Sequence, residues 1–193
     1  MKKYVKEEFG VGALLAPVPS VIVTCGTLES PNAITIAWTG IVCSNPAMTY
    51  ISVRPERYSY ELIKKSGEFV INLTTEELAA ATDFIGVRSG RDMDKLKKCG
   101  LTAAPSSAVS APSLLESPVS LECRVSNMLM LGSHHMFLAS IEAVCVAREL
   151  LDENGRLCLE KAGLIAYSHG EYFSLGKKLG SFGYSVKKKK SRR

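Results

Sequence analysis

A pair of long strand-like runs in the second half of the chain constrains the fold more than any other feature. The runs cover Val119–Leu131 and His134–Ala147, and only Gly132 and Ser133 separate them. A two-residue connection of small residues joins neighbouring strands as an antiparallel hairpin. The sequence therefore predicts strands that pair mainly with their neighbours in the chain, which favours an antiparallel barrel over a doubly wound sheet.

Shorter strands and helices are expected around this hairpin. Ser59–Lys65, Thr75–Ile85 and Asp92–Cys99 are predicted helices, the first two capped by Ser59 and Thr75. Runs rich in β-branched residues and bounded by turn residues predict the strands. These runs are Val21–Cys25, Ala33–Trp38, Met48–Val53, Glu68–Leu73 and Leu164–Tyr167.

The Ala-, Ser- and Pro-rich segment Ala103–Pro118 has the composition of a domain linker. It is short, however, and the strands after it would have no partner sheet of their own. We therefore predict a surface loop within one domain that covers residues 1–186. The fold expected for that domain is mainly β, with about seven strands, three peripheral helices and a last strand at Leu164–Tyr167.

The positive charge of the chain is concentrated at its C-terminus. The last seven residues, KKKKSRR, carry six positive charges, and without them the formal net charge falls from +5 to −1. A terminal run of like charge is typical of a solvated, disordered tail, which is the prediction for residues 187–193. Nucleic-acid binding is the alternative. Because the run has no interleaved aromatic residues and the body is not basic, no nucleic-acid partner is expected.

Membrane insertion and export are not expected either. Apolar runs such as Val18–Cys25 are far shorter than the roughly 20 residues that span a bilayer. Near the N-terminus, an acidic pair stands where a signal peptide needs an apolar stretch. The sequence thus predicts a cytoplasmic protein.

Neither the cysteines nor the histidines form a metal-binding pattern. The six cysteines are scattered singly without a CxxC, so most are expected to be reduced core residues. A catalytic thiol is the alternative, and no neighbouring residue favours it. His134 and His135 are adjacent, and adjacent residues of a strand point to opposite faces. A structural role is the default for each, and no metal site is predicted.

The sequence contains no Walker A loop, GxGxxG, HExxH or GxSxG motif. A more informative stretch is the strand-like run from Asn32 to Gly40, which holds the only tryptophan, Trp38. Its small side chains would let a planar ligand approach the backbone, whose amides can bond the ligand's polar edge. The alternative is a half-buried strand with one core tryptophan.

A second stretch, from Ser52 to Ile63, places Arg54 and Arg57 between a strand and a helix. A helix N-terminus offers unpaired N–H groups and the positive end of the helix dipole. Together with the guanidinium groups and the Ser59 hydroxyl, it would suit a phosphate monoester. The alternative is an ordinary helix cap with solvated arginines.

Taken together, these stretches resemble a known family. The run PNAITIAWTGIVCSNPAMTYISVRPERYSYELIKKSGEFVINL is similar to the core of the flavin reductase-like family, which has an FMN-binding split-barrel fold. LGSHHMFLASIEAV resembles the family's Gly-x-His-x-x-Phe strand, and the resemblance reaches GEYFSLGKKLGSFGYSV. Within the family, the similarity is greatest to flavoredoxin-like members.

The resemblance implies FMN bound without a covalent bond, at the interface of a homodimer. Most of the implied contacts lie in the two stretches, and His135 leaves the choice of the family histidine open. Ser59 stands where many members have threonine, and both residues offer a hydroxyl. The implied ring contacts are Asn32, Trp38, Ala37 and Thr39, and Phe173 matches an aromatic residue near the ring. His134 matches the family histidine on the later strand, Arg54, Arg57 and Ser59 match the phosphate region, and Lys95 matches a lysine at the cofactor.

The resemblance implies electron transfer through FMN. The implied function is an NAD(P)H-dependent oxidoreductase, and no side chain is predicted to be catalytic because FMN carries the chemistry. The alternatives are a flavoredoxin-type carrier that takes electrons from a protein donor, and a non-enzymatic FMN-binding module. A haem-binding split barrel is disfavoured because haem has no phosphate to match the arginines.

Overall fold

The computed structural model describes residues 1–186. The predicted basic tail, residues 187–193, lies outside the described residues. Among residues 1–186, no helix has the length and apolar character needed to cross a membrane.

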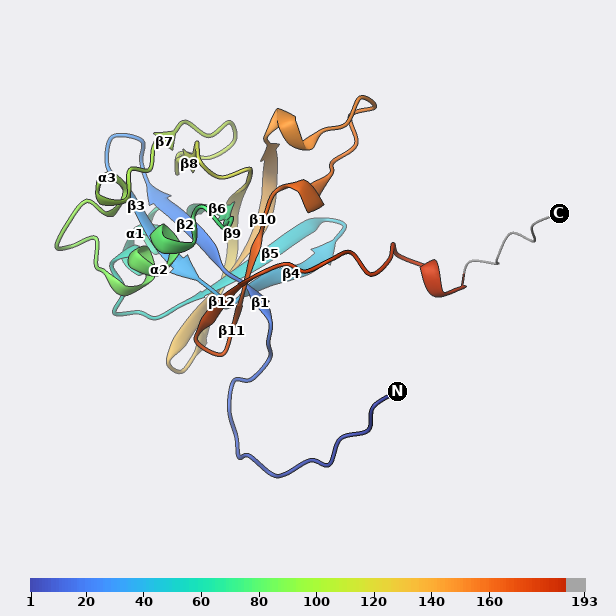
Figure 1. Cartoon of the computed structure of the whole chain (residues 1–193). Coiled ribbons are helices and arrows are strands. Elements are labelled where there is room, and N and C mark those ends of the chain that lie inside the picture. The colour runs from blue at the N-terminus through green and yellow to red at the C-terminus, as the bar shows by residue number, and fades with distance from the viewer. Residues whose placement is uncertain (187–193) are drawn as a thin grey trace.

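A seven-stranded antiparallel sheet forms the body of the molecule (Figure 1). Its two edge strands, β3 and β4, follow each other in the chain with only Ala37 and Trp38 between them. The Ser52 N–H donates to the Trp38 carbonyl (2.9 Å), which ties this junction to β5. The sheet therefore curls until its edges meet, as a split barrel requires. Its order is β3 (Pro31–Ile36), β2 (Val21–Gly26), β6 (Glu68–Leu73), β9 (Val119–Leu131), β10 (His134–Val146), β5 (Ala47–Val53) and β4 (Thr39–Ser44).

The predicted mainly β, antiparallel architecture is confirmed. The hairpin at Gly132 and Ser133 is also confirmed, with β10 ending at Val146, one residue before the predicted end. Two register shifts between β9 and β10, beside Leu138 and Ile141, interrupt the pairing. Such bulges bend a strand and strengthen its twist, which helps this long hairpin follow the curvature of the barrel.

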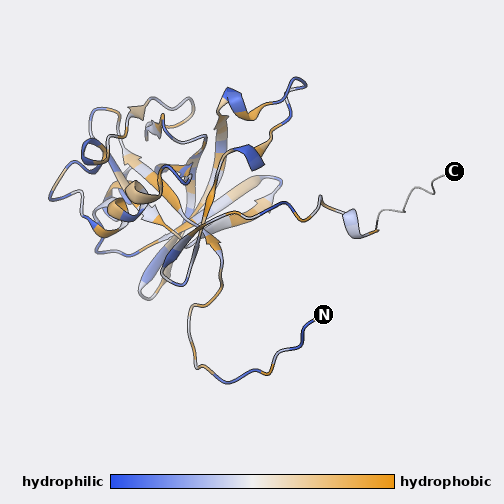
Figure 2. Cartoon of the chain, viewed as in Figure 1, coloured by the Kyte–Doolittle hydropathy of each residue, from blue (hydrophilic) through white to orange (hydrophobic). Residues whose placement is uncertain are grey.

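Alternation of side chains along the strands builds two cores. In β5, Thr49, Ile51 and Val53 are buried and the residues between them are not. The barrel core gathers side chains such as Val23, Phe69 and Phe137, and burying each aliphatic or aromatic side chain contributes about 1.5–3 kcal/mol. A second core lies between the sheet and the helices (Figure 2). It consists of Ile22, Ala33, Ile85, Leu96 and Leu114.

Three α-helices accompany the sheet, and the first residue of each differs from the predicted one. Helix α1 (Tyr58–Ser66) has Arg57 as its N-cap, so the prediction of Ser59 as the cap is wrong. Ser59 is buried inside the first turn because its hydroxyl accepts a bond from the Asn32 side chain. Helix α2 (Ala79–Val87) begins four residues after Thr75, since a separate turn precedes it. Helix α3 (Lys95–Cys99) begins three residues after Asp92 and is capped by Asp94.

Short strands complete the fold and raise the total among the described residues from the predicted seven to twelve. The expected loop at Ala103–Pro118 contains a small hairpin, β7 (Ala103–Ala104) with β8 (Ser113–Leu114). The expected last strand is β11 (Ile165–Ser168), but β12 (Glu171–Ser174) follows it and pairs with it. β1 (Val18–Pro19) adds a third strand to this small sheet. Short 3-10 helices lie at Arg148–Leu150, Leu159–Lys161 and Tyr184–Val186.

Candidate functional site

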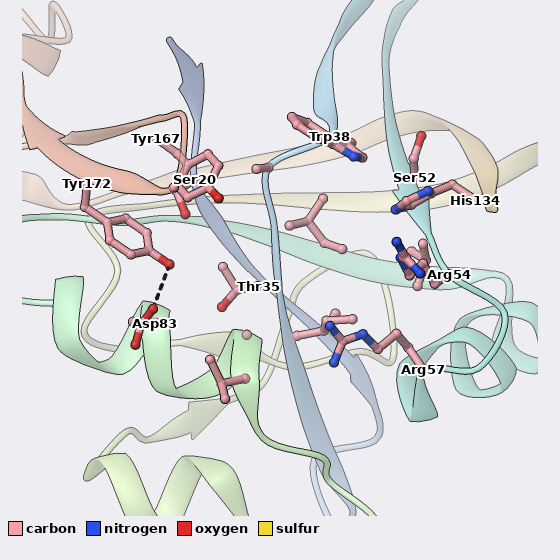
Figure 3. Close-up of a pocket in the computed structure, with 17 residues that line it drawn as sticks. Ser20, Thr35, Trp38, Ser52, Arg54, Arg57, Asp83, His134, Tyr167 and Tyr172 are labelled. Atoms are coloured by element: carbon pink, nitrogen blue, oxygen red, sulfur yellow. Dashed lines mark hydrogen bonds between the residues drawn. The ribbon is translucent and has the colours of Figure 1, made fainter. Parts of the chain in front are cut away.

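A cavity of about 350 Å³ opens where the two edges of the barrel meet (Figure 3). Consecutive residues of β3 and of the β3–β4 junction, from Ile34 to Trp38, form one wall. An edge strand presents backbone N–H and C=O groups that no neighbouring strand uses. The end of β5, helix α2 and the β11–β12 hairpin supply the other walls.

A second hollow of about 390 Å³ continues from the first. It lies at the N-terminus of α1 and reaches the segment from Arg88 to Lys95. Ile34, Arg54 and Arg57 line both hollows, so the two form one elongated site. The first hollow is bordered by an aromatic residue, Trp38, and the second by a concentration of positive charge.

The second hollow has the composition of an anion site. Of the described residues that line it, five are cationic and one, Glu56, is acidic. Glu56 pairs with Arg54 (3.4 Å), and its carbonyl accepts from Arg91 (3.0 Å). The five cationic residues are Arg54, Arg57, Arg88, Arg91 and Lys95.

Helix α1 strengthens this preference for anions. Its N-cap residue, Arg57, makes no side-chain capping bond. The first N–H groups of a helix lack intrahelical acceptors, and Tyr58 and Ser59 line the hollow at this point. The arrangement offers backbone donors, the positive end of the helix dipole and guanidinium groups to one ligand.

Lys95 is almost fully buried beside the hollow, with 5% of its surface exposed. Its ammonium group donates to the carbonyls of Ile85 and Arg88, both at 3.1 Å. Burial is the main cause that lowers the pKa of Lys95 to about 8, and the positive charge of Arg57 also lowers it. An anion bound in the hollow would restore the preference for the charged form.

Asn32 and Gly90 shape the same end of the site. The Asn32 amide donates to the Ser59 hydroxyl (2.7 Å), which fixes the start of α1 against β3. A side chain at Gly90 would collide with the Asn32 amide oxygen and approach the Tyr58 ring. Gly90 is therefore required for the close passage of the segment from Arg88 to Arg91 over β3.

The two adjacent histidines point to different surroundings, as predicted from strand geometry. His134 lines the first cavity, and its ring nitrogen lies 3.0 Å from the Ser133 hydroxyl. Burial and the nearby Arg54 lower the pKa of His134, although Glu56 opposes this. His135 instead meets the Tyr60 hydroxyl (2.7 Å). Of the two, His134 is thus the one placed at the cavity.

Most of the predicted site residues come together. Ala37, Trp38, Arg54, Arg57 and His134 line the first cavity. Arg54 and Arg57 also line the second, with Ser59 and Lys95. Asn32 lies beside that hollow, bonded to Ser59.

Thr39 and Phe173 are not among the residues that line the two hollows. Thr39 is buried at the start of β4, and its hydroxyl donates to the Tyr50 carbonyl (2.6 Å). Phe173 is half exposed, and its neighbour Tyr172 lines the cavity instead, because adjacent residues of β12 face opposite ways.

Other lining residues were not predicted. Arg88 and Arg91 flank Gly90, and an Arg-Ser-Gly-Arg sequence after a helix was a signal available for a phosphate loop. The remaining residues carry no comparable signal because long-range folding brings them to the cavity. They include Ser20, Asp83, Tyr167 and Tyr172.

Neither thiol nor metal chemistry is evident in the described part of the chain. No cysteine lines either hollow, and all six are free, with Cys25, Cys123 and Cys158 buried. Burial raises the pKa of the Cys25 thiol to about 11. Among residues 1–186, no three His, Cys, Asp or Glu side chains are grouped as metal ligands.

Comparison with known proteins places the chain in a family. The model of the flavin reductase like domain matches residues 14–176. The chain belongs to the flavin reductase-like family. It is 28% identical to flavoredoxin of Desulfovibrio vulgaris (Miyazaki F); the match has a TM-score of 0.88 and covers 95% of this chain and 100% of that one.

Two relatives of known sequence are similar to most of the chain. An uncharacterized protein of Archaeoglobus fulgidus is 33% identical over 127 residues, which cover 66% of this chain and 71% of the relative. An NADH-dependent FMN reductase of Streptomyces nodosus subsp. asukaensis is 27% identical over 143 residues, covering 74% of this chain and 76% of that protein.

The site of this flavin reductase-like chain fits a flavin mononucleotide. The cationic hollow at a helix N-terminus suits a phosphate monoester, and the cavity beside Trp38 suits a planar ring. Trp38 is 37% exposed, so part of its surface is open to a ligand. The first cavity, where the ring would lie, is called the ring cavity from here on. The Ser20 hydroxyl lines it and is buried without a hydrogen-bond partner among the described residues. A buried polar atom of this kind is rare unless a ligand or water satisfies it.

Proposed function

We propose that this protein binds FMN without a covalent bond and acts as an NAD(P)H-dependent oxidoreductase of the flavin reductase-like family. The observation that carries the proposal is the continuity of the two hollows. One end concentrates cationic groups and helix N–H groups, and the other offers an aromatic wall beside an open strand edge. A molecule with a phosphate at one end and a planar ring at the other would fill both.

In this proposal, the residues of the chain bind and orient the cofactor. Arg57, Arg88 and the N-terminus of α1 hold the phosphate, and the buried Lys95 adds positive charge beside it. Trp38 and Ala37 border the ring. When bound, FMN supplies the ring that accepts and passes on electrons. The phosphate site also argues against haem as the ligand.

Titration of the flavin-free protein with FMN and with riboflavin tests the assignment of the two ends. Riboflavin lacks the phosphate, so it should bind much more weakly than FMN. The double variant Arg57→Ala/Arg88→Ala should weaken FMN binding at least about 100-fold, because each lost charge-assisted bond costs roughly 1.5–3 kcal/mol. It should weaken riboflavin binding far less, because riboflavin has no phosphate to lose contacts.

The matched control is Arg148→Ala/Arg156→Ala, since neither arginine lines the two hollows. The control should bind FMN like the wild type. Equal affinity of the wild type for FMN and riboflavin, or wild-type FMN affinity in Arg57→Ala/Arg88→Ala, would show that the basic hollow is not a phosphate site.

A flavoredoxin-type electron carrier is the second candidate, favoured by the similarity to the Desulfovibrio flavoredoxin along the whole of that chain. Mixing the FMN-loaded protein with NADH or NADPH in a stopped-flow spectrometer separates the two. Rapid bleaching of flavin absorption by either nucleotide supports the reductase. Bleaching no faster than that of free FMN supports the carrier.

A further inference from the structure

The ring cavity has a polar end that the proposed phosphate contacts leave unused. Ser20 and the two tyrosines of the β11–β12 hairpin lie there with Asp83 of α2, across β3 from Arg54 and Arg57 (Figure 3). Tyr167 and Tyr172 are cross-strand partners with ring centroids 5.5 Å apart. The cavity therefore has a cationic side and an oxygen-rich side.

Ser20 is the unusual member of this group. It is 2% exposed, and its hydroxyl has no hydrogen-bond partner among the described residues. Leaving a buried hydroxyl unpaired destabilises the folded protein. A ligand that hydrogen-bonds this hydroxyl would remove this destabilisation, so the position selects for a polar atom of the ligand.

Asp83 provides the acceptor at the same end. It is the only carboxylate among the described residues that line the ring cavity. The Tyr172 hydroxyl donates to one carboxylate oxygen over 3.4 Å, a long bond that leaves the second oxygen available. Burial, followed by the charge of Asp83, raises the pKa of Tyr172 to about 12, so its hydroxyl remains a donor at neutral pH.

These groups complement an imide, which presents one N–H between two carbonyls. The guanidinium groups on the opposite side of the cavity only donate, so they cannot accept from the N–H. A carboxylate can accept it, while serine and tyrosine hydroxyls can donate to the carbonyls. The flavin ring carries an imide at one end and an apolar methylated ring at the other, so the cavity's polarity favours one orientation.

We propose that Ser20, Asp83 and Tyr172 hold the imide edge of the flavin ring, and that the Asp83 carboxylate lowers the reduction potential of the bound flavin. The proposal rests on the proposed function, since it requires that FMN binds in this cavity. A fixed negative charge beside the ring disfavours the reduced, more electron-rich state. Asp83 would thus keep the flavin a strong reductant.

The test uses Ser20→Ala and Asp83→Asn in the full chain loaded with FMN. Ser20→Ala should weaken FMN binding about three- to tenfold, as expected for one neutral hydrogen bond. Without FMN, its melting temperature should equal or exceed that of the wild type, because the variant removes an unpaired buried hydroxyl. A purely structural serine would show the opposite pattern, with a lower melting temperature and unchanged binding.

Asp83→Asn keeps the size of the side chain and removes its charge. The midpoint potential of bound FMN, measured by spectroelectrochemistry, should become more positive than in the wild type. Glu171→Gln is the control, since Glu171 is a carboxylate next to Tyr172 on the β11–β12 hairpin and does not line the cavity. Its midpoint potential should stay at the wild-type value.

Two results would overturn this inference while the FMN site stands. One is an unchanged midpoint potential in Asp83→Asn together with wild-type FMN affinity in Ser20→Ala. The other is a raised KM for NAD(P)H in Asp83→Asn with unchanged potential and FMN affinity, which would assign the polar end to the electron donor. Failure of the wild type itself to bind FMN would refute the proposed function as well, so the two failures are distinguishable.

Discussion

At the scale of single residues, Lys95 joins the fold to the proposed phosphate site. Its ammonium group is held by two carbonyls at the end of α2, and burial lowers its pKa to about 8. A bound phosphate favours the charged lysine. FMN affinity should therefore fall as the pH rises through about 8, where the free protein loses this proton. Isothermal titration calorimetry at several pH values between 7 and 9.5 measures how the FMN affinity changes with pH.

Lys95→Met is the variant that isolates this effect, because it keeps the length and the buried stem of the side chain. Its FMN affinity should be lower at pH 7 and flat across the same range. The same lysine affects folding without ligand. Its lowered pKa adds to the free energy of unfolding a contribution that rises between pH 8 and 10.5, and the difference between the wild type and Lys95→Met measures this contribution. A fall of FMN affinity with pH that persists in Lys95→Met would assign the titration to another group.

A substitution at Gly90 tests how closely the segment from Arg88 to Arg91 packs against β3. In Gly90→Ala, the new methyl group would collide with the Asn32 amide, which itself bonds Ser59. We expect a loss of about 1–3 kcal/mol of stability from overpacking, together with weaker FMN binding. Thermal or urea unfolding measures the first effect. Gly176→Ala is the control, because a side chain there meets no atom within 4 Å, and it should behave like the wild type.

Sequence patterns located the two ends of the site but not every contact. Arg54 and Arg57 could be placed because they precede a helix, a local feature. Ser59 was assigned the wrong local role, since its partner, Asn32, lies 27 positions away in the chain. Ser20 and Asp83 could not be found, because only the packing of the small β-sheet and α2 against β3 brings them together.

At the scale of elements, two buried carboxylates anchor the segment Ala103–Pro118. Glu122 of β9, 1% exposed, accepts from the backbone N–H groups of Ser107 (3.0 Å) and Ala108 (2.6 Å). Glu68 of β6 accepts from the Ser110 N–H (2.7 Å) and pairs with Arg124. The composition of the segment indicated a loop, and long-range bonds of this kind give it a fixed conformation.

Glu122→Ala should cost about 2–4 kcal/mol of stability, because it removes a buried carboxylate together with the charge-assisted bonds that it accepts from the Ser107 and Ala108 N–H groups. FMN affinity per folded molecule should not change, since this segment does not line the two hollows. Urea unfolding and FMN titration of the same preparation measure both quantities, with Glu149→Ala as an exposed control. A large loss of FMN affinity without a loss of stability would connect this loop to the site.

The pH dependence of this anchor follows from the same contacts. Burial opposes the charge of Glu122, but the N–H bonds from Ser107 and Ala108 outweigh it and lower the carboxyl pKa. The stabilisation is therefore present above the unfolded pKa of about 4.3 and is lost as the pH falls through the lower folded value. Glu122→Ala should lack this part of the acid sensitivity.

At the scale of the whole molecule, both ends of the described chain leave the body as extended arms (Figure 1). The arms expose large apolar side chains, including Phe9 and Leu15 in the first and Leu179 and Phe182 in the second. Edge strand β4, which starts beside Trp38, exposes Ile41 and Val42. Exposed apolar surface of this extent is typical of protein interfaces.

A homodimer with two equivalent FMN sites is the prediction for this scale, with the arms and β4 packed against a second copy. Light scattering after gel filtration should give a mass twice the 20.9 kDa of one chain. Removing residues 2–12 should weaken the dimer, because Phe9 and the other apolar side chains of this arm would no longer pack against the second copy. A 20.9 kDa species that binds one FMN per chain would contradict the prediction.

The central claim is that the joined hollows hold FMN, and the flavin released from the purified protein tests it most directly. The protein should be yellow, and denaturation without covalent cleavage should release a single flavin. Chromatography against standards should identify it as FMN, at about one molecule per chain after saturation. Release of FAD, retention of the flavin on the denatured chain, or a colourless protein that cannot be loaded with FMN would contradict the account.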